Sequence, residues 1–177
     1  MEEIETRRPK RKLKKWSEIV AVVLMSLALA FCVIEAKGMM RASGVLWMNI
    51  VSGQSMQPNF HTGDFVFVTN LEEIQRYDIV TATTPNETEV IKRVIGMPGD
   101  TITYKGRHIY VNGKLSDESF INNPDDNATA TDYLQGELTL GDGEYFLAGD
   151  NRENSSDSRI YGAVERSAIH GKVIAKS

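Results

Sequence analysis

Cysteine and histidine are scarce in this sequence, with one Cys and three His among 177 residues. The single thiol, Cys32, lies in an apolar run, so the chain can form no internal disulfide, no CxxC redox pair and no cysteine-based metal cluster. Cysteine usage therefore does not fix the redox compartment.

The main body of the chain also lacks an excess of positive charge. Residues 1–16 contain seven Lys or Arg and three Glu, whereas the remaining residues contain 13 Lys or Arg and 21 Asp or Glu. Nucleic-acid binding needs clustered positive charge to neutralise phosphates. An acidic body behind a short basic head therefore argues against a nucleic-acid partner.

Helical periodicity is absent after residue 45, where short apolar runs alternate with turn residues. The predicted strands lie within 64–69, 77–84, 89–96, 101–104, 107–115, 144–150 and 171–176. The run 107–115 contains Asn112-Gly113, a strong hairpin signal. Residues 116–143 are polar and predict a long surface excursion or small insertion, so that 101–148 holds a hairpin and this insertion. The expected fold class is mainly β, with antiparallel strands in two packed sheets or an irregular barrel.

The longest uncharged run lies near the beginning of the chain, at residues 19–34. As a helix it would span about 24 Å, so neighbouring residues must help it to cross a hydrocarbon core of about 30 Å. The pattern predicts a basic head over 1–15, a transmembrane anchor over 16–36 with Trp16 at the interface, and an extracytoplasmic domain over 37–177. The basic flank predicts a cytoplasmic N-terminus.

Two other interpretations of this run stay open. A cleavable signal peptide has the same layout, but the run ends without a clean Ala-x-Ala site. A buried core helix of a soluble protein is the other, and the preceding cations disfavour it. The apolar residues 38–51 that follow are interpreted as a first core strand, as an apolar rim at the bilayer surface, or as both.

Ser55 lies on a tight turn within "SGQSMQPNFHTGD", between Gly53 and Pro58. An alcohol is a weak nucleophile and needs a base within hydrogen-bond reach. His61 is the only histidine nearby, and none of the three lies in a motif-like setting. We therefore expect all three histidines of the chain, His61, His108 and His170, to be surface or turn residues.

Lys92 is a better candidate for the base. It lies in a predicted strand whose two faces are both apolar, with Val90 and Val94 on its own face. Burial disfavours the charged amine and can lower its pKa by up to about 3–5 units, which would leave a neutral base near pH 7. The other interpretation is a structural lysine held in an ion pair.

A polar stretch, "GDNRENSSDSRIYG" at 149–162, follows an apolar strand. Its arginines argue against a calcium loop, and a network of Arg–carboxylate pairs is expected instead, with a solvated turn as the alternative. No metal and no cofactor is expected.

Three stretches together, "SGQSMQP", "IKRVIGMPGD" and "GDNRENSSDSRIYGAV", resemble the bacterial type I signal peptidases, which are membrane-anchored Ser-Lys proteases. The resemblance covers roughly residues 19–177, with 116–143 matched only loosely. It implies that Ser55 is the nucleophile, that Lys92 is the general base, and that the hydroxyl of Ser155 orients the lysine amine.

The resemblance also implies supporting roles. Asp157 and Arg159 would form a structural ion pair, and Asp150 would brace the loop against Arg93. Gly53 stands where some relatives have a serine that stabilises the oxyanion, so backbone N–H groups, including that of Ser55, are expected to form the oxyanion hole. "QPNF" replaces the family's more usual "xPTL", which predicts a change in the shape of the turn.

The implied function is removal of signal peptides from secretory pre-proteins with small-x-small cleavage sites, at the outer face of the bacterial cell membrane. The protein would be single-pass, with a cytoplasmic N-terminus and with the lipid bilayer as a second partner. Two other hypotheses remain: a non-catalytic membrane-anchored factor for surface-fibre assembly on the same fold, and a self-cleaving Ser-Lys regulator.

Overall fold

The computed structural model describes residues 18–29, 31–32, 46–105, 108–121 and 136–177. The chain divides into two units, 1–43 and 44–177. Residues 18–29 and 31–32 of the first unit are helical. None of the helices in these described ranges is long and apolar enough to cross a membrane. The predicted basic head and both ends of the predicted anchor lie outside the described residues.

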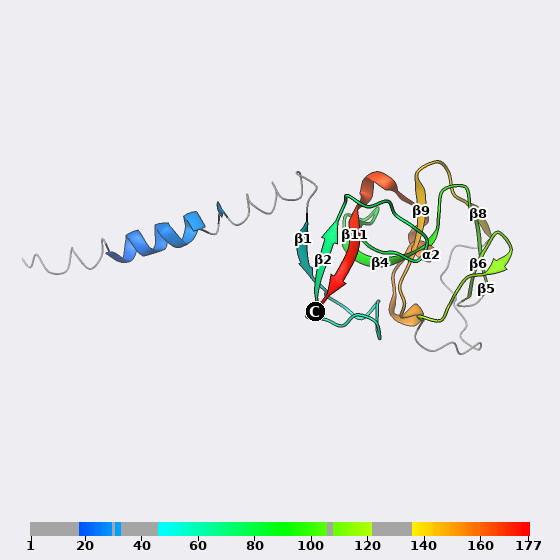
Figure 1. The fold of residues 1–177 in the computed structure, drawn as a ribbon, viewed down its shortest axis with the longest axis horizontal. Coiled ribbons are helices and arrows are strands. Elements are labelled where there is room, and N and C mark those ends of the chain that lie inside the picture. The colour runs from blue at the N-terminus through cyan, green and yellow to red at the C-terminus, as the bar shows by residue number, and fades with distance from the viewer. Residues whose placement is uncertain (1–17, 30, 33–45, 106–107, 122–135) are drawn as a thin grey trace, which may run out of the picture. The chain divides into compact units, whose positions relative to one another are not determined.

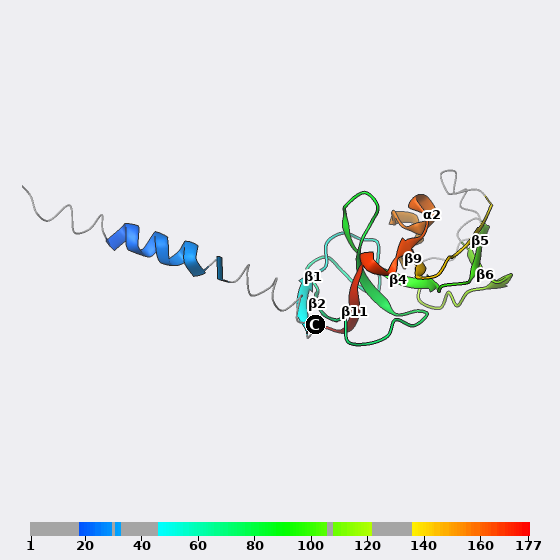
Figure 2. The same ribbon diagram turned by 90° about the horizontal axis from the view of Figure 1, so that it is seen from above.

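The second unit is built from two antiparallel sheets (Figures 1 and 2). The larger sheet has the strand order β1-β2-β11-β3-β4-β9-β10, and the smaller has the order β7-β6-β5-β8. Both views place β5 and β6 at the far end of this unit from β1 and β2. The strands are β1 (Trp47–Ile50), β2 (Phe65–Thr69), β3 (Ile79–Thr83), β4 (Glu89–Gly96), β5 (Thr101–Lys105), β6 (His108–Val111), β7 (Lys114–Leu115), β8 (Glu137–Thr139), β9 (Glu144–Ala148), β10 (Val164–Glu165) and β11 (Ile169–Lys176).

Helical structure in the described part of this unit is short. It consists of η1 (Arg152–Asn154), α2 (Ser158–Tyr161) and η2 (Arg166–Ala168). Asp157 caps α2, because its side chain accepts a hydrogen bond from the Arg159 backbone N–H. The mainly β, antiparallel fold expected from the sequence is therefore confirmed.

Each apolar run predicted as a strand overlaps at least one strand, and β4 covers the whole of 89–96. The hairpin signal at Asn112-Gly113 joins β6 to β7. The polar stretch 116–143 was expected to be a surface excursion or a small insertion, but a strand lies near its end. This strand, β8, pairs with β5 from Thr101↔Thr139 to Thr103↔Glu137. Residues 122–135 of that stretch lie outside the described residues.

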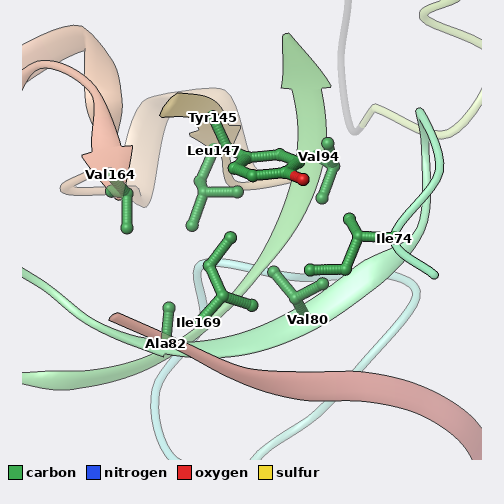
Figure 3. Packing of buried hydrophobic residues seen from close by; sticks show 8 residues of the cluster. All are labelled: Ile74, Val80, Ala82, Val94, Tyr145, Leu147, Val164 and Ile169. Carbon is green, nitrogen blue, oxygen red and sulfur yellow. The ribbon is translucent and has the colours of Figure 1, made fainter. Parts of the chain in front are cut away.

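Three clusters of buried hydrophobic side chains fill the domain. The first lies between β3, β4, β9 and β11, where the eight side chains converge in Figure 3. The second lies beneath the Ser55 turn and includes Trp47, Met56, Phe60 and Val68. The third, with Ile95, Ile102, Ile109 and Phe146, joins the small sheet to the large one. β4 is central to the core, because Ile91, Val94 and Ile95 each belong to a different cluster.

Candidate active site

The turn that carries Ser55 follows β1 and is fixed at both ends. The Val51 N–H donates to the Asp64 carbonyl at 2.9 Å, and the Gly63 N–H donates to the Val51 carbonyl at 2.9 Å. Met56 is 1% exposed and packs into the cluster beneath the turn. With its neighbour anchored in the core, Ser55 is half-buried, facing the large sheet.

Gly53 adopts a left-handed backbone conformation in this turn, with φ of 93°. Its N–H donates to Thr62 Oγ1 at 3.1 Å, and its carbonyl accepts from the same hydroxyl at 2.9 Å. A side chain would meet nothing within 4 Å there, so backbone strain rather than lack of space favours glycine.

Lys92 lies in the middle of β4, between β3 and β9, and is 3% exposed. Its Nζ donates to Ser55 Oγ at 2.8 Å and to the Ile91 carbonyl at 3.2 Å. The fold thus brings a buried amine to a half-buried hydroxyl that is 37 residues away in the chain.

Burial lowers the pKa of Lys92 from 10.5 to about 8. Nearby charges oppose one another, because Asp157 and Asp150 raise this pKa whereas Arg159 lowers it. Desolvation therefore dominates, since an ammonium group loses its hydration inside the protein. A lysine with this pKa is partly neutral near pH 7 and can accept a proton.

The loop that follows β9 lies directly against the Ser55 turn. The Asn151 backbone N–H donates to the Ser55 carbonyl at 2.9 Å, and the Asn151 side chain donates to the Gln54 carbonyl at 3.1 Å. At Gly149 the two segments touch so closely that a Cβ would lie 2.5 Å from the Ser55 carbonyl and 2.2 Å from Ser155 Oγ. Only glycine fits at this position.

Ser155 lies in the same loop and is 8% exposed. Its hydroxyl lies near the buried Asp157 carboxylate and contributes to holding the pKa of that carboxyl low. The structure places it beside Gly149 and close to the Ser55 backbone. Its predicted role in orienting the lysine amine stays a prediction.

Asp157 and Arg159 form a two-pronged ion pair in which neither side chain is exposed. Arg159 donates from Nε to Oδ1 and from Nη2 to Oδ2, both at 2.8 Å. Burial alone would raise the pKa of Asp157, but the bonds and charge of Arg159 and the Gly149 N–H outweigh it and hold this pKa low. A carboxylate satisfied in this way stays ionised and fixes the loop.

Asp150 and Arg93 form a second two-pronged pair, at 2.8 Å and 2.7 Å. Asp150 is fully buried, and its Oδ2 also accepts from Asn59 Nδ2 at 2.9 Å. Because Asn59 belongs to the serine turn and Arg93 to β4, this carboxylate connects the elements that carry Ser55 and Lys92. The sequence singled out Asn59 only as a departure from the family's usual pattern.

A cavity of about 460 Å³ opens beside the Ser55–Lys92 pair. Its lining includes apolar side chains of Val66, Ile91 and Val90. His170 also lines it, with its ring nitrogen 2.8 Å from Thr83 Oγ1. A second cavity, of about 550 Å³, is lined by neither Ser55 nor Lys92, so the size of a cavity does not single out the one beside this pair.

The other two histidines lie in different surroundings. His61 is exposed, and its backbone N–H bonds to the side chain of Asp64 at 2.9 Å. His108 is half-buried on β6 and lies 2.5 Å from Glu118 Oε2. No cluster of His, Cys, Asp and Glu within the described ranges could hold a metal ion.

Comparison with known proteins gives concordant matches. The family model described as "Signal peptidase, peptidase S26" matches residues 16–177. A signal peptidase I from Bacillus caldolyticus is 33% identical over 181 residues, covering 95% of this chain and 92% of the relative. Signal peptidase I V from Bacillus subtilis (strain 168) is 38% identical over 136 residues, covering 70% and 80%.

A solved structure gives a further match. The crystal structure of a signal peptidase I from Enterococcus faecalis V583 matches with a TM-score of 0.49 and 30% identity, covering 60% of this chain and 100% of that chain. The family model spans most of the chain, and the Bacillus caldolyticus protein is similar over nearly all of it. The chain therefore belongs to the signal peptidase family, peptidase S26.

Proposed function

We propose that this protein is a type I signal peptidase, a serine endopeptidase that removes signal peptides with a Ser55–Lys92 dyad. One observation carries the proposal: a buried amine with a lowered pKa lies 2.8 Å from a half-buried serine hydroxyl at the edge of a cavity. This is the geometry that an activated alcohol requires, and Ser-Lys pairs are a recognised variant of the serine triad.

The reaction follows from these two groups. Ser55 Oγ attacks the scissile carbonyl carbon while the neutral Lys92 amine accepts the hydroxyl proton. Collapse of the tetrahedral intermediate breaks the C–N bond, and the Lys92 ammonium donates that proton to the leaving amine. A water molecule then attacks the acyl ester, with Lys92 again accepting a proton and returning it to Ser55.

Backbone N–H groups around Ser55, including its own, would stabilise the oxyanion. The Gly53 N–H is engaged by Thr62 Oγ1, which supports a hole built without a contribution from that group. The oriented peptide dipoles of the turn would supply the stabilisation in this arrangement.

The proposed substrates are secretory pre-proteins with small-x-small cleavage sites. A lining of Val66, Val90 and Ile91 supports apolar subsites for small side chains next to the scissile bond. An extended peptide would pair its backbone with an exposed strand edge, which provides affinity with little dependence on side chains.

The proposed location is the outer face of the bacterial cell membrane. Residues 16–36 would anchor the chain with its N-terminus in the cytoplasm, because the basic residues precede the apolar run. Three apolar side chains near the serine turn support contact with the bilayer surface: Met48 is 47% exposed, Ile50 is 62% exposed and Phe65 is 41% exposed.

The test is processing of a purified pre-protein by the full chain in detergent or proteoliposomes. We expect a single cut after the small-x-small site, with activity lost in both Ser55→Ala and Lys92→Ala. Lys114→Ala, which changes an exposed lysine on β7, is the matched control and should retain activity. Equal processing by wild type and both dyad variants would refute the dyad, and no processing by wild type would favour the assembly factor.

A further inference from the structure

The short segment 116–121, called the clasp segment from here on, contacts the three parts of the chain that build the proposed active site. These are the serine turn, β4 and the loop after β9. It belongs to none of them, and it follows the β6–β7 hairpin of the small sheet. Its contacts are made mainly by Glu118 and Phe120.

Glu118 faces a buried arginine of the loop after β9. Arg152 is 1% exposed, and its Nη1 lies 3.2 Å from Glu118 Oε1. Burial lowers the pKa of Arg152 and the nearby Arg159 lowers it further, whereas Glu118 is the first of the charges that oppose this change. A buried guanidinium needs such a partner, because desolvation of an unpaired charge is costly.

Arg152 in turn bonds to the residue at which the loop after β9 comes closest to the serine turn. Its Nε donates to the Gly149 carbonyl at 3.1 Å. Gly149 is the residue that leaves no room for a Cβ beside the Ser55 carbonyl and Ser155 Oγ. Contacts therefore run without a break from Glu118 through Arg152 to the backbone of the nucleophile.

Phe120 contacts the other two stretches. Its carbonyl accepts from Asn59 Nδ2 at 2.8 Å, so it shares the Asn59 amide with Asp150. Its ring lies 4.2 Å from the Arg93 guanidinium carbon, in a cation–π contact. Thus Phe120 holds the serine turn through Asn59 and the lysine strand through Arg93.

The small sheet and Tyr77 fix the clasp segment itself. Glu118 Oε1 accepts from the Ile109 N–H at 3.2 Å, and Glu118 Oε2 lies 2.5 Å from His108 Nδ1. The Asp117 N–H donates to the Tyr77 hydroxyl at 3.1 Å, and the Tyr77 ring lies 5.7 Å from that of Phe120. A segment held in this way can transmit the position of the small sheet to the active site.

We infer that Glu118 and Phe120 are positioning residues, which set the geometry of the Ser55–Lys92 pair through Arg152, Asn59 and Arg93. The inference rests on the proposed function. Reaction within a dyad depends steeply on geometry, and a misplacement of about 1 Å can cost about 100-fold in rate. The residues that line the substrate cavity are separate from the clasp segment, so its perturbation should change turnover rather than substrate binding.

The test measures kcat and KM separately for the full chain acting on a pre-protein. Glu118→Gln removes the charge but keeps the shape, and Phe120→Leu removes the aromatic face but keeps apolar volume. We expect kcat to fall by about 10-fold to 100-fold in each, with KM unchanged. Phe120→Tyr keeps the aromatic face toward Arg93, so its kcat should match that of wild type. If Phe120 only filled space, Phe120→Leu would also keep a kcat near that of wild type.

Matched controls are Glu137→Gln and Leu115→Ala, which change exposed residues of the same small sheet. Near-UV circular dichroism and thermal melts establish the folded fraction, and kcat is expressed per folded molecule. If both clasp variants match their controls in kcat while Ser55→Ala is inactive, the inference fails and the proposed function stands. If the wild-type chain does not process the pre-protein, both fail.

Discussion

The pH dependence of cleavage tests the proposed role of Lys92 most directly. Burial lowers its pKa from 10.5 to about 8, which corresponds to about 3 kcal/mol. At pH 7 about one molecule in ten would carry the neutral amine, compared with about three in 10,000 for an unperturbed lysine. Burial therefore increases the population of competent base about 300-fold.

We expect kcat/KM to rise about tenfold per pH unit below pH 8 and to level off above it, because only the neutral amine accepts the Ser55 proton. The assay is initial cleavage of a fluorogenic peptide with a small-x-small site, from pH 5 to 10. An acid limb that is absent, or that lies well away from pH 8, would refute the assignment of Lys92 as the base.

His170 provides the control for this profile, because it lines the same cavity. Its ring bonds Thr83 Oγ1 at 2.8 Å and lies 3.9 Å from Glu89. In His170→Gln the limb near pH 8 should persist. An acid limb that disappears in His170→Gln would assign the titration to the imidazole instead.

The same pKa also predicts how stability depends on pH. Between pH 8 and 10.5 the unfolded state holds the Lys92 proton and the folded state does not, so the free energy of unfolding should rise with pH in that window. Lys92→Met should lack this rise and should be more stable than wild type below pH 8, by up to about 3 kcal/mol. Chemical denaturation at pH 7 and pH 10 measures both, and a parallel rise in the variant would contradict the linkage.

Three substitutions in the loop after β9 have separate expected outcomes. Gly149→Ala should reduce kcat by about 100-fold, because the new Cβ would lie 2.2 Å from Ser155 Oγ, whereas Gly141→Ala would meet only the Glu144 side chain at 3.2 Å and should stay active; equal activity would refute the close approach. Asp157→Asn should lower the free energy of unfolding at pH 7 by about 3–5 kcal/mol, because it leaves a buried arginine without its charge partner; urea titration measures this, and an unchanged midpoint would contradict it. Ser155→Ala should lower kcat/KM, because it removes the hydroxyl proposed to orient the Lys92 amine; cleavage kinetics of folded protein measure this, and an unchanged kcat/KM would count against the orienting role.

Local pattern was sufficient to predict most of the strands. The run 89–96 is apolar on both faces, and it forms β4 with the same boundaries, in the interior of the larger sheet. Asn112-Gly113 predicted the hairpin because two residues with positive φ are needed there, and their φ values are 52° and 76°. β8 was missed because its three residues lie in a polar stretch, and its pairing with β5 supplies the order that its own sequence does not.

The site was predictable only where a motif marked it. Ser55 and Lys92 were singled out by chemistry and family resemblance, and the fold brings them to 2.8 Å. The contacts of Asn59 and Asn151 were not foreseen, because they join residues 91 and 97 positions apart, respectively, and carry no periodic signal. His170 was expected to be a surface or turn residue, yet it lies on β11 and lines the cavity beside the Ser55–Lys92 pair.

The sheet order has a consequence for the newly made chain. β11, residues 169–176, lies between β2 and β3 and pairs with both. Until these residues leave the ribosome, β2 and β3 have no common partner, and the Ser55 turn beside β2 is not joined through the sheet to Lys92 on β4. Synthesis from the N-terminus thus makes the strand that joins β2 to β3 last, so the sheet that connects the Ser55 turn to Lys92 can close only when nearly the whole chain is made.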